Sequence, residues 1–379
     1  MNKNEYQLKL NTEVQTDKAK YYAAFSYLLI RPLFKAKLFE FFDYDIKRAF
    51  CADENDLKMF SEQTELSVPR DFLKKRDKLD IDKCFDSALD FDGINIVTYE
   101  DEKYPPLLRQ IPDFPLALYY KGDIDNMDYE YTLAVVGSRK ATNEAKGAMT
   151  NIIRGLYQNP VTIVSGLAYG IDATAHKAAL SADLKTIAVI ASGLDIIYPA
   201  QNTQLFYEIL NRGGVVFTEY PLKTGPIRIN FPQRNRIVVG ISQGTFVVEA
   251  QKRSGAMISA NLTLDYNREL ICMPGNVSNP NTEGIYYLIK NGAGMACNTN
   301  DILENMNWSF KIQEKSDPVC GLTDIQKRVY EVMSKEPKTF DEIMLEAKID
   351  TSDLMVVLTE LELNGLIKQA DNKFYKYTW

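Results

Sequence analysis

Between residues 128 and 275, short runs of apolar, mostly β-branched residues alternate with amphipathic segments. The runs predict buried strands at 132–138, 161–166, 186–193, 214–220, 244–250 and 269–275. The amphipathic segments predict helices at 143–157, 171–180 and 202–212. Strands that alternate with helices form a parallel sheet with helices on both faces, so the central domain is predicted to be α/β. Ligands of such sheets bind beyond the carboxyl ends of the strands, which locates the candidate site.

The chain before this domain has a different pattern. Residues 21–42 carry apolar side chains densely enough for one or two buried helices, and residues 1–95 contain almost no glycine. This segment is therefore predicted to be a small helical domain. The segment 104–123 contains four prolines and predicts an irregular connecting arm, which ends in a short strand and turn at 116–123.

The end of the chain predicts a winged-helix module. A polar linker at 311–322 precedes predicted helices at 324–334, 339–347 and 351–364, and a β-hairpin with its turn near Asp371 and Asn372 follows. The chain is therefore expected to have three domains. They are a helical domain at 1–95, an α/β domain at 96–312 and a winged-helix domain at 318–379.

The charge of the winged-helix segment bears on its partner. From Asp324 to Asp371 it contains eleven acidic residues, against eight basic residues from Lys327 to Lys376. Its third predicted helix has no lysine or arginine, whereas a winged helix that grips duplex DNA usually has a basic recognition helix. We therefore favour a protein contact or an auxiliary role. Three lysines on the hairpin keep weak DNA binding open: Lys368, Lys373 and Lys376.

Composition narrows the classes of function. The net charge of −7 means that any nucleic-acid site must be a local cluster of basic residues. Five scattered cysteines and one histidine predict no metal site and favour a reducing compartment. The start of the chain lacks the pattern of a secretory signal, and no apolar run approaches roughly 18 residues, so we expect a cytoplasmic protein without a membrane contact. Neither GxGxxG nor GxxxxGK[ST] occurs, so no nucleotide cofactor is expected.

Glycine-rich turns follow three of the predicted strands. Gly137 and Ser138 precede Arg139, and outward-facing backbone N–H groups together with an arginine fork would suit a phosphate. The alternative is an ordinary turn with a solvated arginine. Two further turns follow the same logic and present four small residues: Ser165, Gly166, Gly170 and Gly193.

One of these turns also carries Asp172 and the single histidine, His176. Asp172 is expected to cap the helix that follows or to tuck under its start, and His176, one helical turn later, to hydrogen-bond with it. For a lone histidine in this setting we favour a structural role over a catalytic one.

A fourth segment, 229–264, is the richest in basic residues. Phe231 precedes the triplet Arg234, Asn235 and Arg236, and the stretch Lys252, Arg253, Ser254 and Gly255 follows a predicted strand at its carboxyl end. Arginines and lysines that hold phosphates beside an aromatic ring that stacks on a base are typical of single-strand binding without sequence readout. The alternative is an internal salt bridge from Arg234 or Arg236 to Glu219 or Glu249.

Several motifs, in this order, closely resemble the DprA/Smf family of DNA-processing proteins. They are AVVGSR, IVSGLAYGIDATAHKAAL, ASGLDIIYPAQN, EYP, INFPQRNRIVVGISQGTFVVEAQKRSGAMISA and ICMPGNV. The resemblance covers about residues 98–305. Two positions depart from the common pattern, namely Tyr169, where many members have a basic residue, and Asn230, where members often have histidine.

The resemblance implies a Rossmann-like domain that binds single-stranded DNA, without a known enzymatic activity. Members form homodimers through this domain and load the RecA recombinase onto incoming DNA during natural transformation. The family's DNA contacts correspond to the Gly137–Arg139 turn and to Phe231 and Arg234–Arg236. The Lys252–Gly255 stretch resembles part of the same pocket.

Two alternatives belong to other classes. GISQGTFVVEA resembles the Gly-Thr…Glu motif of phosphoribohydrolases, which have a similar fold and use a glutamate to cleave an N-glycosidic bond. Here Gly240-Ile241-Ser242 replaces the Pro-Gly-Gly part of that motif, and Glu249 lies one residue further from the Gly-Thr pair. The other alternative is a scaffold whose pocket is vestigial, which the dense arginine cluster disfavours.

Overall fold

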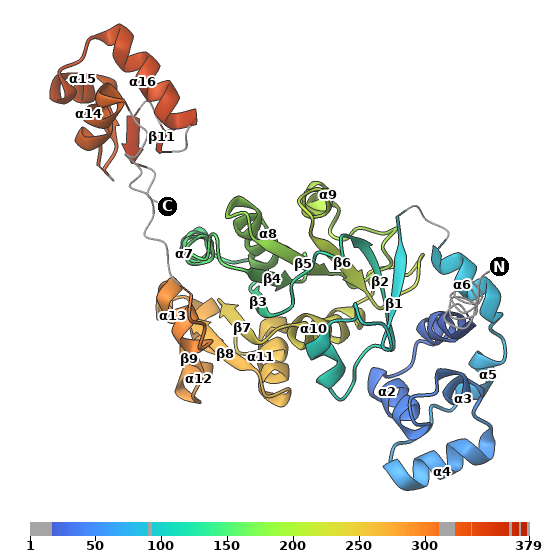
Figure 1. The fold of residues 1–379 in the computed structure, drawn as a ribbon. Helices are drawn as coiled ribbons and strands as arrows, with labels where there is room; N and C mark the ends of the chain where they lie inside the picture. Colours follow the sequence, from blue (N-terminus) through green and yellow to red (C-terminus); the bar gives the residue numbers. More distant parts are fainter. Residues whose placement is uncertain are drawn as a thin grey trace. The chain divides into compact units, whose positions relative to one another are not determined.

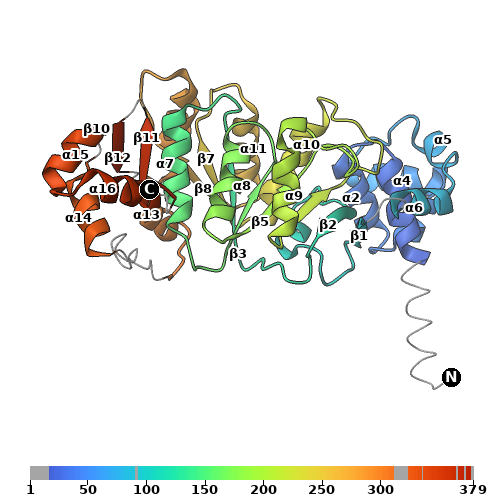
Figure 2. The same cartoon turned by 90° about the horizontal axis from the view of Figure 1, so that it is seen from above.

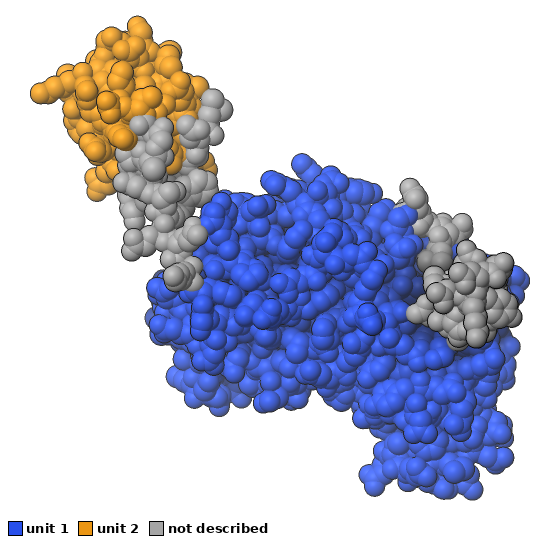
Figure 3. Space-filling view, in the orientation of Figure 1, with its two compact units in different colours: residues 1–310 blue, residues 311–379 orange. Residues whose placement is uncertain are grey.

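The computed structural model describes residues 17–89, 93–310, 323–334, 336–363, 366–370 and 373–376. The chain divides into two compact units, residues 1–310 and residues 311–379 (Figure 3). The helical segment and the sheet thus belong to one unit, and the boundary expected at residue 95 stays a prediction from the sequence.

The first unit is built on a nine-stranded sheet in the order β1-β2-β6-β5-β4-β3-β7-β8-β9 (Figure 1). Seven neighbouring strands, β3 to β9, are parallel, and β1 and β2 form an antiparallel edge. The strands are β1 (Asn95–Thr98), β2 (Ala117–Gly122), β3 (Tyr131–Gly137), β4 (Val161–Ser165), β5 (Lys185–Val189), β6 (Val215–Thr218), β7 (Gly244–Val248), β8 (Glu269–Met273) and β9 (Gly294–Met295). The six predicted strands and the short strand of the arm are therefore confirmed.

Helices cover both faces of the sheet. The helices of this part of the chain are α7 (Asn143–Arg154), α8 (Ile171–Ser181), α9 (Thr203–Asn211), α10 (Asn230–Ile241), α11 (Gly255–Asp265), α12 (Glu283–Lys290) and α13 (Thr299–Asn305). Figure 1 shows α7 to α9 on one face and α10 and α11 on the other, and Figure 2 shows α7, α8 and α9 side by side. The central strands, buried on both faces, lack the alternation of polar and apolar residues that a half-exposed strand would show. The expected α/β fold is confirmed.

One segment differs from the sequence analysis. The sequence pattern predicts no helix within the basic segment 229–264, but Asn230–Ile241 forms the regular helix α10. The proline at position 232 does not prevent this, because a proline in the first turn removes an N–H group that has no partner within the helix.

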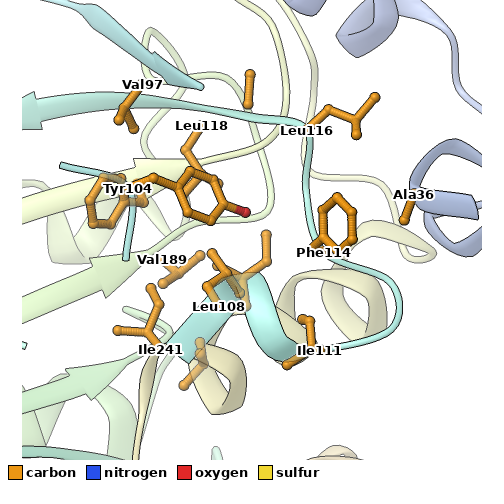
Figure 4. Close-up of a cluster of buried hydrophobic side chains, with 14 of the residues drawn as sticks. Ala36, Val97, Tyr104, Leu108, Ile111, Phe114, Leu116, Leu118, Val189 and Ile241 are labelled. Carbon is orange, nitrogen blue, oxygen red and sulfur yellow. The ribbon is translucent and has the colours of Figure 1, made fainter. Parts of the chain in front are cut away.

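The N-terminal helices pack onto the antiparallel edge of the sheet. Residues 17–27 are helical, and α2 (Pro32–Phe41), α3 (Ile46–Cys51), α4 (Glu54–Thr64), α5 (Phe72–Arg76) and α6 (Ile81–Leu89) follow. The ring of Phe39 lies 5.5 Å from that of Tyr99 and 6.4 Å from that of Phe114, centroid to centroid. Figure 4 shows Ala36 of α2 beside Phe114 of the arm, and Tyr104 belongs to the same apolar core. The helices and the sheet thus bury a shared surface.

The second unit is a winged helix. It contains α14 (Asp324–Val332), α15 (Phe340–Ala347), α16 (Thr351–Leu363) and a three-stranded sheet in the order β10-β12-β11, formed by β10 (Lys338–Thr339), β11 (Ile367–Ala370) and β12 (Lys373–Lys376). Val329, Ile343, Leu354 and Leu361 lie in its buried core. The three predicted helices and the hairpin strands are confirmed, whereas the turn at Asp371 and Asn372 and the linker 311–322 lie outside the described residues.

His176 has the structural role favoured from the sequence, with a different partner. Its side chain on α8 is fully buried, and its Nδ1 atom lies 2.7 Å from Thr186 Oγ1 on β5. Because the Thr186 hydroxyl donates to the Ile163 carbonyl oxygen, Nδ1 carries the proton and donates to Thr186. The expected bond to Asp172 is absent. Asp172 lies in the first turn of α8, whose N-cap is Gly170, and its Oδ2 accepts from the Ala168 N–H at 3.4 Å, so it tucks under the helix start and does not cap it.

This burial makes the stability of the first unit depend on pH. Burial, aided by the charge of Arg234, lowers the pKa of His176 to about 3. Below a pH of roughly 6.5, the ordinary pKa of histidine, His176 binds a proton in the unfolded chain but not in the folded chain. The free energy of unfolding therefore falls as the pH falls from about 6.5 towards 3. His176→Asn keeps the bond to Thr186 and should remove this dependence, about 1.4 kcal/mol per pH unit. Urea unfolding of both proteins at pH 7 and pH 5 measures it, and parallel losses in the two proteins would contradict the assignment.

Candidate nucleic-acid interface

A large cleft of the first unit lies beyond the carboxyl ends of β3 and β7. It encloses about 1010 Å³, and its walls come from the turn after β3, the segment 226–235 and the start of α11. From β3 the chain proceeds through β4, β5 and β6 on one side, whereas β7 and β8 lie on the other. Loops that diverge at such a switch point leave a crevice between them, and this is where the sequence pattern predicted the site.

The structure brings together nine of the fifteen residues predicted to bind DNA. Eight line the cleft: Gly137, Ser138, Arg139, Phe231, Arg234, Asn235, Ser254 and Gly255. Gly166 lines a smaller adjoining hollow together with Arg139, Phe231 and Arg234. The other six lie elsewhere: Ser165, Gly170, Gly193, Arg236, Lys252 and Arg253.

The turn after β3 faces the cleft mainly with its side chains, and two of its backbone amides are bonded within the protein. The Ser138 N–H donates to the Val248 carbonyl oxygen at 3.3 Å, and the Lys140 N–H donates to Ser138 Oγ at 3.1 Å. These two amides, which were expected to face outward, are engaged within the fold. The side chain of Arg139 is exposed, and its guanidinium lies 5.0 Å from the centroid of the Phe231 ring. Arg139 forms no ion pair within the described residues, so its charge is available to a ligand.

The helical form of 230–241 separates the side chains of the basic triplet. Successive residues of a helix are rotated by about 100°, so Phe231, Arg234 and Asn235 share one face while Arg236 points away. Arg236 is buried and pairs with the Glu219 carboxylate, with the Asp113 carboxylate 3.9 Å from its Nε. The internal salt bridge to Glu219, kept as an alternative from the sequence, is therefore what the structure shows for Arg236.

Arg234 forms the floor of the cleft. Its side chain is only 3% exposed, and its Nη1 donates to the carbonyl oxygens of Gly166 and Val189, at the ends of β4 and β5. Burial lowers the pKa of Arg234, and the nearby Asp172 carboxylate opposes this shift. Gly166 is required because a Cβ at this position would collide with the guanidinium. Arg234 thus joins two strand ends while one edge of it lines the cleft.

The remaining predicted residues have local roles or lie outside the cleft. Ser165 Oγ donates to the Val135 carbonyl oxygen at 2.6 Å, and the Gly193 N–H donates to that of Thr224 at 2.9 Å. Gly170 has a φ of 78°, in the region that favours glycine. Lys252 and Arg253 are exposed beside the start of α11 but do not line the cleft.

Three further residues line the cleft that the sequence analysis did not single out. Lys140 and Arg228 are exposed and, like Arg139, form no ion pair in the part of the chain that the structure describes. The ring of Tyr198 packs edge-to-face against Phe231, with centroids 5.8 Å apart. The signal for Arg228 was a basic residue three positions before the aromatic ring. The signal for Tyr198 was an aromatic residue in the turn after β5.

Glu249, the residue required by the enzyme alternative, is buried, and its carboxylate is hydrogen-bonded within the protein. Its carboxylate accepts from the Thr142 N–H at 2.9 Å, from the Thr142 hydroxyl at 2.7 Å and from Asn279 Nδ2 at 2.7 Å. These bonds hold the start of α7 against the end of β7. Among the described residues no group of three or more metal-binding side chains occurs, and no described helix is long and apolar enough to span a membrane.

Together, the Rossmann-like sheet, the crevice at its switch point and the winged helix define an α/β protein with a second, winged-helix unit. The family described as DNA recombination-mediator protein A matches residues 95–307, and the DprA winged helix domain matches residues 313–373. The chain therefore belongs to the DNA recombination-mediator protein A family, as the sequence motifs indicated.

Individual relatives agree with this assignment. Protein Smf of Escherichia coli is 36% identical over 280 residues, which cover 72% of this chain and 75% of that protein. The X-ray structure of DNA processing protein A from Streptococcus pneumoniae has a TM-score of 0.64 at 30% identity and covers 78% of this chain and 99% of its own. A Helicobacter pylori structure, described for the single-stranded DNA binding mode of that protein, has a TM-score of 0.52 at 30% identity and covers 57% and 98%.

The two arginines of the cleft should respond differently to truncation. Arg234→Ala leaves two buried carbonyl groups without their guanidinium donor and removes the positive charge near the buried Asp172 carboxylate, so it should lower the free energy of unfolding by about 3 kcal/mol or more. Arg139→Ala removes an exposed side chain and a cation–π contact, and should cost no more than about 1 kcal/mol. Urea unfolding followed by intrinsic fluorescence distinguishes the two, and equal losses would refute the structural role of Arg234.

Proposed function

We propose that this protein binds single-stranded DNA in the cleft between β3 and β7, without catalysing a reaction. The observation that carries the proposal is the cleft itself, which is lined by Phe231 and by three exposed cations, Arg139, Lys140 and Arg228, none of them ion-paired within the described residues; the Arg139 guanidinium lies over the Phe231 ring. Ser254 adds a buried hydroxyl that has no partner among the described residues. The single-stranded DNA binding attributed to the Helicobacter pylori relative supports the same class of ligand.

The geometry suggests how a strand would be held. Phosphates attract the exposed cations, and a base stacks on Phe231 in the place that the Arg139 guanidinium occupies. Arg139 then leaves the Phe231 ring and pairs with a phosphate, so the base takes its place on the ring and the arginine gains an anionic partner. Arg234, fixed beneath them, keeps the floor rigid. Because backbone and stacking contacts are common to all sequences, binding should be weakly selective and strongly salt-dependent.

We further propose the role that the family resemblance implies. The protein would protect incoming DNA in the cytoplasm and load the RecA recombinase onto it during natural transformation. A homodimer formed through the Rossmann-like domain would offer two clefts to one strand and so gain avidity. No cofactor or metal is required by this mechanism.

The enzyme alternative would need Glu249 to act on a nucleotide. Its carboxylate already accepts three hydrogen bonds inside the protein, so it has a structural function instead. Incubation with nucleoside monophosphates tests this directly, because released free base that disappears in Glu249→Gln would restore the enzyme alternative.

Removal of two exposed arginines should weaken DNA binding without unfolding the protein. Arg139→Ala/Arg228→Ala is expected to reduce affinity for labelled oligo-dT by at least about tenfold. It should also make the slope of log affinity against log salt concentration shallower, by about 0.7 for each phosphate that the variant no longer neutralises. Fluorescence anisotropy at two salt concentrations, with a duplex of equal length for comparison, measures both.

A matched control is Arg212→Ala, since Arg212 is exposed at the end of α9, next to the amino end of β6. It should bind oligo-dT like the wild type. Unchanged binding in the double variant, or a preference for the duplex, would mean that this cleft is not the DNA site.

A further inference from the structure

A second groove of the first unit lies between the N-terminal helices and the sheet domain. It encloses about 630 Å³ and is lined by the segments 26–35 and 67–75 of the helical part, together with Glu219, Tyr220 and part of 227–233. Neither the sequence motifs nor the proposed function accounts for it. We call it the helical-domain groove.

The groove and the DNA cleft share one wall, the segment 226–233. Arg228 and Phe231 line the cleft, whereas Ile227, Ile229 and Gln233 line the groove. Neighbouring residues of a single segment therefore face opposite sides, and the wall is only one chain segment thick. A strand that leaves the cleft across this wall enters the groove directly.

The charge of the groove suits a polyanion. Four basic side chains line it, against the single carboxylate of Glu219, which Arg236 already neutralises. Arg31 and Arg70 are exposed and form no ion pair within the described ranges. Lys75 is paired only loosely with the exposed Asp71, at 4.0 Å, and Lys35 Nζ donates to the Phe25 carbonyl oxygen at 2.9 Å. In a chain with a net charge of −7, such a local excess of cations needs an explanation.

Apolar side chains lie between these cations. Leu29, Ile227 and Ile229 are 64%, 51% and 62% exposed and line the groove together with Arg31 and Arg70. Cations that can hold a backbone, interleaved with apolar surface that can contact unpaired bases, fit a single strand better than a duplex, whose bases are stacked inside.

We propose that the helical-domain groove is a second binding segment for the same DNA strand, continuous with the cleft. This inference rests on the proposed function, because the strand must first occupy the cleft. The N-terminal helices would then lengthen the DNA footprint, with Arg31 and Arg70 as phosphate contacts.

The test compares short and long oligo-dT strands. An oligonucleotide of about 6 nucleotides fills the cleft alone, whereas one of about 15 also reaches the groove. In Arg31→Ala/Arg70→Ala the short strand should bind as in the wild type, and the increase in affinity on lengthening should fall about tenfold. The matched control Lys58→Ala/Lys78→Ala removes two exposed cations of the helical domain that do not line the groove, and it should retain the full increase.

The outcomes separate the two proposals. Failure of both strands to bind the wild type would refute the proposed DNA function itself. If Arg31→Ala/Arg70→Ala binds both strands normally and shows the same effect of length as the wild type, the groove does not bind DNA, although the cleft still does. An acidic protein surface would then be the remaining partner for the groove. A circular dichroism spectrum identical to that of the wild type confirms that the variant is folded, so that a smaller effect of length reports the two missing arginines.

Discussion

The candidate site depends on one buried guanidinium. Arg234 donates to the carbonyl groups at the ends of β4 and β5, and those ends form the floor from which the surrounding turns rise. Parallel strands leave a row of carbonyl oxygens at their carboxyl edge, and a buried row without donors is costly. A cation is the strongest donor available to satisfy two of them at once. A side chain at position 166 would collide with the Arg234 guanidinium, so the position of this arginine requires glycine in the turn after β4.

This constraint divides the basic residues of the site into two groups. Buried cations, Arg234 and Arg236, are satisfied by carbonyl groups and by Glu219, and they fix the orientation of α10. Exposed cations, Arg139 and Arg228, have no internal ion-pair partner among the described residues and line the same cleft as the aromatic ring that α10 presents. The buried arginines lose their water when the protein folds, and not again when a ligand binds. They hold the cleft rigid, so the exposed arginines can contact a ligand from a fixed support. A single helix thus carries both the anchor and the binding surface.

The sequence predicted the architecture well because the strands are strongly patterned. Continuous apolar β-branched runs specify buried parallel strands, and the carboxyl-end rule then places the site at the turn of Arg139. The sequence could not show which arginines of the segment 229–236 are buried and which line the cleft. That division appears only in the helix, where successive side chains are rotated by about 100° and so point in different directions. Nor could the sequence show the partner of His176, since Thr186 is ten residues away on a neighbouring strand and only the packing of α8 on β5 brings them together.

The distribution of charge reconciles the acidic chain with the proposed binding of DNA. Electrostatic attraction to phosphates acts over roughly a Debye length of about 8 Å at physiological salt, so the local surface governs binding and the net charge of −7 does not. Asp172, the one carboxylate among the lining residues of the cleft, lies near the positive charges of Arg234 and Arg139. Helix α16 of the winged helix shows the opposite pattern, with exposed Met355 and Val356 and no basic residue. Within one chain, therefore, the cleft of the first unit and helix α16 of the second present surfaces of different chemistry.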